Sequence, residues 1–274
     1  MIVNNLLFVI DIGLDPSIFE FLGLDITWHG FFAALGVVAG VLVSAYYARR
    51  SGYSSDTIYN LAIFLVVGGI IGARLLHVAE EWGYYGSDPI KILAINAGGI
   101  SIYGALLGGT FGALLYGFIA KVPDKWKAAD VAVPGAIFGM AVGRIGDMIN
   151  GEHWARATDL PWGVRYTDVD SPGRMGPLGP DVISHPAVGY ELAGDLVIFA
   201  LLLFIIYRIN RPGWAFVTFL VGYAILRLGV SFLRFDDIVF AGLRMAQLVA
   251  VGSLFAAVPV LIYLSWPNRG QSRG

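Results

Sequence analysis

The chain has 274 residues, of which 57% are hydrophobic and only 14% are charged, and its formal net charge is −2. Soluble domains carry about 25% charged residues, and a mean hydropathy of +0.71 is more than one globular core explains; the composition indicates a membrane protein. The absence of cysteine excludes disulfides, thiolate metal sites and a cysteine nucleophile in this chain.

Residues 1–27 precede the first long apolar run. They lack the basic n-region of a cleavable signal peptide, and Asp11 interrupts their apolar stretch. Together with Asp15, Glu20 and Asp25, this residue predicts a segment that lies at or outside the membrane surface.

Runs of about 20 apolar residues are the signal for transmembrane helices, and we identify seven of them. The third and fourth are rich in glycine. The seven ranges are 28–48, 57–79, 98–120, 131–150, 186–207, 213–233 and 242–265.

Basic residues follow every second run, ending with Arg269 and Arg273 after the last, whereas the other connections are mostly acidic. Because basic connections stay on the cytoplasmic side, we expect the N-terminus outside and the C-terminus in the cytoplasm. The predicted fold class is an all-α, polytopic integral membrane protein with about seven transmembrane helices.

Small residues recur at every fourth position within several runs. This spacing lets helix backbones approach closely in lipid, so we expect tight helix packing at these positions. They are Gly36, Gly40 and Ser44; Gly68 and Gly72; and Gly104, Gly108 and Gly112.

Residues 151–185 are the only sizeable polar segment. Their content of Pro, Gly and Asp is typical of an ordered outer loop. We therefore expect residues 1–274 to form one transmembrane domain, with residues 151–185 as a small extracytoplasmic cap.

Three polar residues lie in the fourth run. An ionisable residue within a span indicates a functional site, because burying it in lipid is costly. Arg144, Asp147 and Asn150 are three residues apart, so they share one broad face of a helix. The alternative is an Arg144–Asp147 pair that only neutralises itself.

The sixth run places Tyr223, Arg227, Ser231 and Arg234 along one stripe at helical spacing. Arg227 has no acidic residue within four positions in its run, so it requires an anion from another helix or from a ligand. Arg234 lies nearer the outer end and is the more ambiguous of the two arginines.

Ionisable residues also occur in the second and fifth runs. Arg74 and His77 belong to the second; His185 begins the fifth, followed by Glu191 and Asp195. The two carboxylates are either structural partners of the arginines or part of a ligand site.

Several arginines in the outer half of the membrane imply an anionic ligand there, because guanidinium groups bind phosphate bidentately. Lipid-headgroup chemistry is the first functional class that fits. A transporter or binding protein for a small anion is the second, although we find no internal repeat of the kind common in transporters. A seven-helix receptor is the third, and it gives no reason for several buried arginines.

Six motifs stand out along nearly the whole chain. In chain order they are ITWHGFFAALGV, GGISIYGALLGG, GRIGDMINGEHWARATDLPWGVRY, HPAVGYE, LRLGVSFLR and RMAQLVA. They resemble, in order and spacing, the motifs of the prolipoprotein diacylglyceryl transferase family. The third is the most distinctive, because the family signature is close to G-R-x-G-N-x-x-N-G-E.

The resemblance implies an enzyme of the bacterial inner membrane. The family transfers the diacylglyceryl group of phosphatidylglycerol to the lipobox cysteine of a prolipoprotein signal peptide, which forms a thioether and releases glycerol phosphate. This is the first step of lipoprotein maturation. The resemblance also implies that the partners are membrane lipid and the signal peptide. It implies no nucleic acid, no cofactor and no metal.

By the same resemblance, Arg144 matches the arginine that binds phosphatidylglycerol, and Arg227 matches the other essential arginine. With Tyr103 they are the expected catalytic residues. The expected substrate-binding residues are Arg144, Asp147, Asn150, Glu152, Tyr223, Arg74, His29, His185 and Glu191. Asp130 also matches a family position and is expected to be structural.

The chain departs from the family pattern in several places. Tyr103 stands where many members have histidine, and a free phenol is a poor base, with a pKa of about 10. His29 stands where tyrosine is common, Asp147 where asparagine is usual and Ser231 where glutamate is frequent. A catalytically inactive relative is therefore a further alternative.

Overall fold

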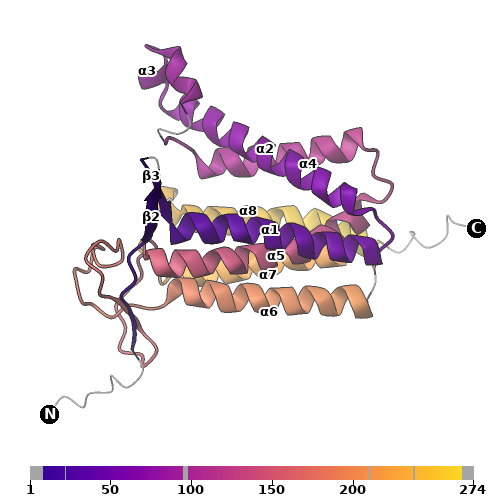
Figure 1. The fold of residues 1–274 in the computed structure, drawn as a ribbon. Coiled ribbons are helices and arrows are strands. Elements are labelled where there is room, and N and C mark those ends of the chain that lie inside the picture. Colours follow the sequence, from indigo (N-terminus) through magenta and orange to yellow (C-terminus); the bar gives the residue numbers. More distant parts are fainter. Residues whose placement is uncertain (1–8, 22, 95–97, 210, 237, 267–274) are drawn as a thin grey trace, which may run out of the picture. The chain divides into compact units, whose positions relative to one another are not determined.

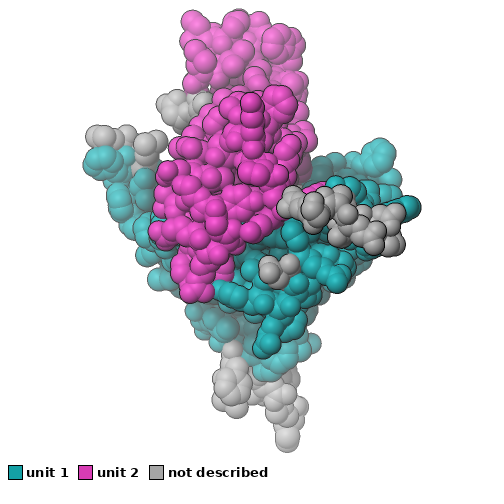
Figure 2. Space-filling view, turned by 90° about the vertical axis from the view of Figure 1, so that its right-hand side faces the viewer, with its two compact units in different colours: residues 1–44, 129–274 teal, residues 45–128 magenta. Residues whose placement is uncertain are grey.

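A computed structural model describes residues 9–21, 23–94, 98–209, 211–236 and 238–266 of the chain (Figure 1). Arg269 and Arg273, two of the basic residues used to orient the chain, lie outside them. The chain forms two compact units: residues 1–44 with 129–274 are unit 1, and residues 45–128 are unit 2 (Figure 2). Each unit is described by itself.

The structure is mostly helical, as the sequence predicts. Within the described ranges, six helices are long and apolar enough to cross a membrane, and a shorter apolar helix spans Tyr103–Ile119. The expected number of seven spans, their orientation and the single domain with a cap stay predictions. The six are α1 (Trp28–Arg50), α2 (Ser55–Glu80), α5 (Lys125–Asn150), α6 (Ala187–Arg208), α7 (Trp214–Ser231) and α8 (Met245–Ser265).

Two helix starts differ from the hydropathy prediction by four residues or more, for local reasons. The helix α5 begins six residues early, because the Asp124 carboxylate accepts a hydrogen bond from the Lys127 backbone N–H (3.0 Å) and so caps the helix. Helix α4 (Ile102–Ile119) begins late, because Gly98 and Gly99 have φ angles of +84° and +78° that no helix contains.

In unit 1, α1 and α5 pack through small residues. A Cβ added to Gly36 would lie 2.5 Å from the Gly139 carbonyl oxygen, and one added to Gly40 would lie 2.7 Å from that of Gly135. The Ser44 hydroxyl donates to the Ala132 carbonyl of α5 (2.9 Å). The predicted close packing of Gly36, Gly40 and Ser44 is confirmed.

The opposite side of α5 packs against α6 and α7. The buried core shared by these helices consists of Val133, Ile137, Ile198, Leu202, Ile205 and Ala215. At one end of this core, the buried Asp130 carboxylate accepts hydrogen bonds from the backbone N–H groups of Gly213 (2.6 Å) and Phe216 (2.8 Å) at the start of α7. These bonds support the structural role expected of Asp130.

Short strands organise the polar part of unit 1. Strand β1 (Ile10–Ile12) pairs in parallel with β4 (Val164–Tyr166), and β2 (Ser17–Phe21) pairs antiparallel with β3 (Leu24–Thr27). A third pair joins β5 (Ile238–Phe240) to β6 (Leu243–Arg244). The N-terminal segment is thus tied to residues 151–185.

Side-chain contacts reinforce the β1–β4 pair. Arg165 donates to both carboxylate oxygens of Asp11, at 2.8 and 2.9 Å, and this contact holds the pKa of Asp11 below its ordinary value. The Tyr166 hydroxyl donates to the Met148 carbonyl (2.9 Å), and burial raises the pKa of Tyr166 to about 12. Residues 151–185 therefore fold back onto the end of α5.

Unit 2 contains α2, α3 (Trp82–Tyr85), the 3-10 helix η1 (Pro89–Leu93) and α4. Helices α2 and α4 make its most extensive contact. A Cβ at Gly72 would lie 2.7 Å from the Gly108 Cα, and one at Gly108 would lie 2.8 Å from the Gly72 Cα. The glycine spacing thus corresponds to a close approach of two backbones, as predicted.

We predict that Gly108→Val destabilises the α2–α4 pair by about 1–3 kcal/mol, because its side chain would meet backbone rather than a movable side chain. Equilibrium unfolding of the purified protein in detergent measures the change. The matched control is Gly117→Val in the same helix, where an added Cβ meets nothing within 4 Å. Equal losses in both variants would contradict the packing argument.

Candidate active site

Three membrane helices of unit 1 bring a set of charged side chains together. We call this set the arginine cluster; it consists of Arg144 and Asp147 from α5, Glu191 and Asp195 from α6, Arg227 from α7, and Arg234, three residues beyond α7. Three guanidinium groups thus face three carboxylates. This balance matters because an unpaired charge in a low-dielectric interior is costly.

Glu191 is the centre of the arginine cluster. Only 1% of its surface is exposed, and its carboxylate contacts three arginines. Oε2 lies 3.1 Å from Arg144 Nη1, whereas Oε1 accepts a hydrogen bond from Arg227 and lies 3.5 Å from Arg234 Nη1. The sequence left open whether Glu191 is an arginine partner, and these contacts show that it is.

Part of the hydrogen-bonding capacity of the cluster is unused. Arg144 Nε and both carboxylate oxygens of Asp195 are buried without a hydrogen-bond partner among the described residues. The closest approach, Arg144 Nε to Asp195 Oδ2, is 3.8 Å, too long for a hydrogen bond. Buried polar groups are nearly always satisfied, so these atoms are the part of the cluster whose hydrogen bonds a polar ligand would complete.

Asp147 does more than neutralise Arg144. Its Oδ2 accepts a hydrogen bond from Arg144 Nη1 (2.9 Å), and its Oδ1 bonds to Nδ1 of His29, at the start of α1 (2.7 Å). His153 Nε2 lies 3.6 Å from the same carboxylate. The interpretation of a self-neutralising helical pair is therefore incomplete.

Sequence reasoning underestimated Arg234 and missed His153. Arg234 is buried, donates to the Asp236 carboxylate (3.1 Å) and donates to His153 Nδ1 (3.0 Å). The helical stripe that starts at Tyr223 already contains Arg234, so the spacing signal was present. His153 carried no such signal, because its role depends on the turn that follows α5.

Two predicted substrate-binding residues lie next to this cluster. The Tyr223 ring packs on the α5–α6–α7 core, and its hydroxyl is near enough to Arg144 and Arg227 for electrostatic interaction. Asn150 is buried at the last position of α5. Gly151 then turns the chain with a φ of +78°, where a Cβ would lie 2.7 Å from the Tyr166 ring.

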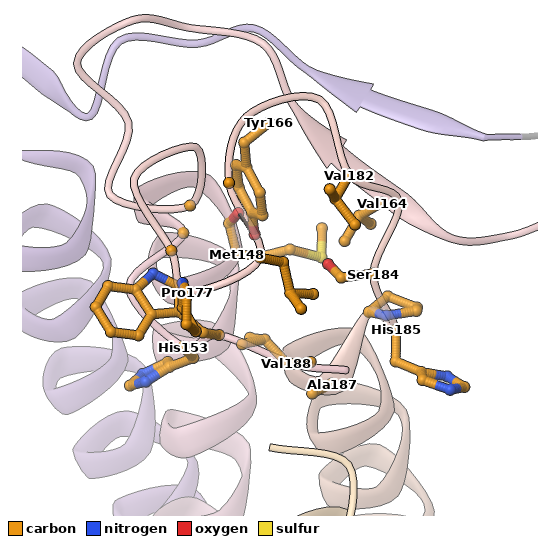
Figure 3. Close-up of a pocket in the computed structure, with 18 residues that line it drawn as sticks. Met148, His153, Val164, Tyr166, Pro177, Val182, Ser184, His185, Ala187 and Val188 are labelled. Atoms are coloured by element: carbon orange, nitrogen blue, oxygen red, sulfur yellow. Dashed lines mark hydrogen bonds between the residues drawn. The ribbon is translucent and has the colours of Figure 1, made fainter. Parts of the chain in front are cut away.

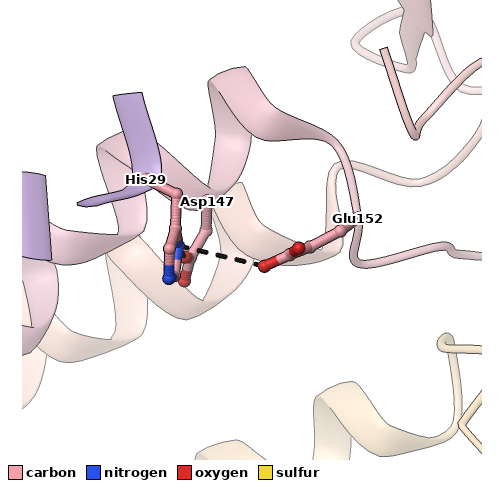
Figure 4. Close-up of side chains that lie close together, drawn as sticks. All are labelled: His29, Asp147 and Glu152. Atoms are coloured by element: carbon pink, nitrogen blue, oxygen red, sulfur yellow. Dashed lines mark hydrogen bonds and ion pairs between the residues drawn. The ribbon is translucent and has the colours of Figure 1, made fainter. Parts of the chain in front are cut away.

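His29, Asp147 and Glu152 form a second group at the edge of the arginine cluster (Figure 4). One ligand atom from each lies within 4.8 Å of the others, a spacing that a cation accepts. However, the two oxygens of Asp147 already bond to His29 and Arg144, and a guanidinium group at 2.9 Å repels a cation. The three side chains are therefore better suited to proton transfer by the His29 imidazole, paired with the Asp147 carboxylate, than to binding a metal ion.

His185 lines a pocket that is formed largely by residues 151–185. His153 and His185 line opposite sides of this pocket (Figure 3). Its volume is about 30 Å³, enough for about two or three waters at about 10–15 Å³ each and not for a lipid. His185 Nδ1 lies 3.4 Å from the Tyr190 hydroxyl, which accepts from Trp162 (3.0 Å).

Comparison with known proteins identifies the family of the chain. Residues 16–263 match the family described as prolipoprotein diacylglyceryl transferase. The chain belongs to the prolipoprotein diacylglyceryl transferase family. With its apolar helices, this membership makes it a multi-pass protein of the bacterial inner membrane.

Curated relatives named phosphatidylglycerol–prolipoprotein diacylglyceryl transferase support the assignment. The chain is 35% identical over 259 residues to the protein from Nostoc sp., covering 91% of this chain and 89% of the relative. It is 32% identical to that of Clostridioides difficile (94% and 98% covered) and 35% identical to that of Dehalococcoides mccartyi (92% and 95% covered).

The family's G-G-x-x-x-H/Y-G motif lies in unit 2. Tyr103, its aromatic residue, is the second residue of α4 and remains a predicted catalytic residue on the strength of the motif. The carbonyls of Gly98 and Gly99 both accept hydrogen bonds from Arg74 Nη1, at 2.7 Å each.

Arg74 is fully engaged within unit 2. Its other N–H groups donate to the carbonyls of Lys91, Ile92 and Ala94. All five donors of the guanidinium group are therefore used by the backbone around η1 and the Gly-Gly turn. These contacts favour a structural role over the substrate-binding role that the sequence suggested.

We predict that Arg74→Lys lowers the apparent melting temperature of the purified protein, because an ammonium group has three donors at one point and cannot reach carbonyls on both sides. The segment around residues 86–101 should also be cleaved faster by protease. Arg49→Lys, an exposed arginine of the same unit, is the control and should change neither quantity. A stable Arg74→Lys protein would contradict the structural role.

We predict that Glu191→Ala lowers the free energy of unfolding by about 3–5 kcal/mol, because it leaves buried guanidinium groups without their shared carboxylate. Equilibrium unfolding in mixed micelles measures the loss, and Glu191→Gln should lose less. The exposed carboxylate of Glu81 provides the control, where Glu81→Ala should change stability by about 0.5 kcal/mol or less.

Proposed function

We propose that the chain transfers the diacylglyceryl group of phosphatidylglycerol to the thiol of the lipobox cysteine in a prolipoprotein signal peptide. The proposal rests on family membership together with one observation. Arg144, from the family's signature motif, lies in a membrane helix with a buried Nε that has no hydrogen-bond partner among the described residues. A phosphate oxygen at membrane depth would give this N–H group the hydrogen bond that it lacks.

The reaction is an alkyl transfer at carbon. The thiol sulfur attacks the glyceryl carbon that carries the phosphate ester, the C–O bond breaks, and the electron pair leaves with glycerol phosphate. Negative charge therefore grows on the phosphate oxygens in the transition state. Guanidinium groups fixed in advance stabilise such charge without having to reorganise.

The arginine cluster supplies this preorganisation. Glu191 holds the guanidinium groups of Arg144 and Arg227 beside each other before any lipid binds. A phosphate then shares these groups with Glu191 and takes up the unused Nε of Arg144. Tyr223, whose hydroxyl interacts electrostatically with both arginines, would donate its hydroxyl proton to a phosphate oxygen.

The nucleophile comes from the second substrate. The chain itself has no cysteine, so the thiol can only be that of the signal peptide. A thiolate is the reactive form, and the transfer therefore also requires a group that accepts the thiol proton.

The direct test incubates the purified protein with phosphatidylglycerol and a peptide that carries a lipobox cysteine. We expect release of glycerol phosphate and a peptide mass increased by one diacylglyceryl group. Unchanged peptide together with anion flux into liposomes would instead indicate a transporter. Binding of phosphatidylglycerol without turnover would indicate an inactive relative.

In that assay Arg144→Ala should lower kcat/KM by at least about 10²-fold, the usual loss for a charge-stabilising donor, while the protein stays folded in the membrane. Arg144→Lys should recover little, because lysine lacks the planar fork. The matched control is Arg156→Ala, an exposed arginine of the outer segment, with activity within about twofold. Retained activity in Arg144→Ala would refute the phosphate site.

A further inference from the structure

Two departures from the family's usual residues, His29 and Asp147, are in direct contact. His29 is the second residue of α1, and Asp147 lies in the last turn of α5. Nδ1 of the imidazole and Oδ1 of the carboxylate are 2.7 Å apart (Figure 4). Residues 118 positions apart in the chain thus form one side-chain pair.

Gly146 makes this contact possible. A Cβ at this position would lie 2.9 Å from the His29 Cα and 2.7 Å from the Trp28 carbonyl oxygen. Any larger residue would push the start of α1 away from α5. The backbone of α1 is thereby seated where His29 reaches the neighbouring Asp147.

The contact fixes which ring nitrogen is basic. Because a carboxylate only accepts hydrogen bonds, the Nδ1 that bonds to Asp147 carries a proton, and the neutral ring keeps its lone pair on Nε2. In the described part of the chain, Nε2 has no hydrogen-bond partner. The His29 side chain is 45% exposed, against 10% for Asp147, so Nε2 is accessible to a substrate.

Asp147 also joins this histidine to the phosphate-binding arginine. Its second oxygen accepts a hydrogen bond from Arg144 Nη1 (2.9 Å). The exposed imidazole and the Arg144 guanidinium group are therefore linked by one carboxylate. A thiol that reaches His29 is consequently close to a phosphate held by Arg144.

We propose that His29, oriented by Asp147, is the general base that takes the proton from the attacking thiol, an inference that rests on the function proposed above. The S–H proton moves to Nε2 as sulfur forms its bond to the glyceryl carbon, and the C–O electron pair leaves with the phosphate. Asp147 stabilises the resulting imidazolium, which releases its proton to the departing phosphate or to water. Asp147 is a positioning residue.

Charged groups around the ring suit this role. Asp147 lies on the Nδ1 side, and Glu152 Oε1 is 3.9 Å from the same nitrogen. Arg144 is the nearby positive group, and it is neutralised by contacts with Asp147 and Glu191. General bases of this kind accelerate proton transfer by about 10²–10⁴-fold.

The test compares His29→Ala and His29→Gln with the unaltered full-length protein, using phosphatidylglycerol and a lipobox peptide. We expect kcat to fall by about 10²–10⁴-fold, with KM for phosphatidylglycerol within about twofold because the arginines are intact. Activity of the variant should rise about tenfold per pH unit toward the thiol pKa of about 8.5. Added imidazole should restore part of the kcat of His29→Ala. His77→Gln is the control and should keep kcat.

Double substitution tests the positioning role of Asp147. If Asp147 acts through His29, His29→Ala/Asp147→Asn should be no slower than His29→Ala alone. A further loss in the double variant would show that Asp147 acts through Arg144 instead and would overturn its part of the proposal.

Several outcomes overturn the general base itself. They are an unchanged kcat in both folded His29 variants, a loss confined to lipid affinity, or activity that a chelator removes and Zn²⁺ restores. An active unaltered protein with active His29 variants refutes only this inference. An unaltered protein that transfers no diacylglyceryl group refutes the proposed function.

Discussion

The whole site depends on one buried carboxylate that contacts three arginines. Glu191 is nearly inaccessible, and through it α6 is bound to α5 and to the end of α7. Three guanidinium groups would otherwise repel one another in a low-dielectric environment. The same contact joins the three helices and holds the guanidinium groups beside one another, so stability and the proposed phosphate binding share one origin.

Small residues set the geometry around this contact. The close approach of α1 to α5 at Gly36–Gly139 and Gly40–Gly135 continues to Gly146, where the start of α1 meets the last turns of α5. Helices in lipid lack a hydrophobic driving force between them and associate by close packing and polar contacts. Here the packing also decides which polar side chains meet, because it seats His29 beside Asp147.

The sequence predicts the helices well, because the length of an apolar run is a local property. Arg144 and Arg227 are also recognised from the local sequence as candidate site residues, because a charge within an apolar run is costly in lipid. Other contacts join residues that are separated in the sequence. They are the pairing of His29 with Asp147, the three contacts of Glu191 and the five hydrogen bonds of Arg74. No periodicity reveals these contacts, so Arg74 was predicted to bind substrate and His153 was not among the predicted site residues.

The pairing of α1 with α5 also has a consequence for synthesis in the cell. Most of each helix belongs to unit 1, but residues 51–124, which form most of unit 2, are encoded between them. Translation proceeds at about 5–20 residues per second. Roughly 5–20 s therefore pass between the synthesis of the glycine face of α1 and the synthesis of α5, which packs against it. During this interval α1 is a helix without its partner, exposed to other nascent helices. The order of insertion, and not only the final packing, is therefore part of how this protein reaches its native arrangement.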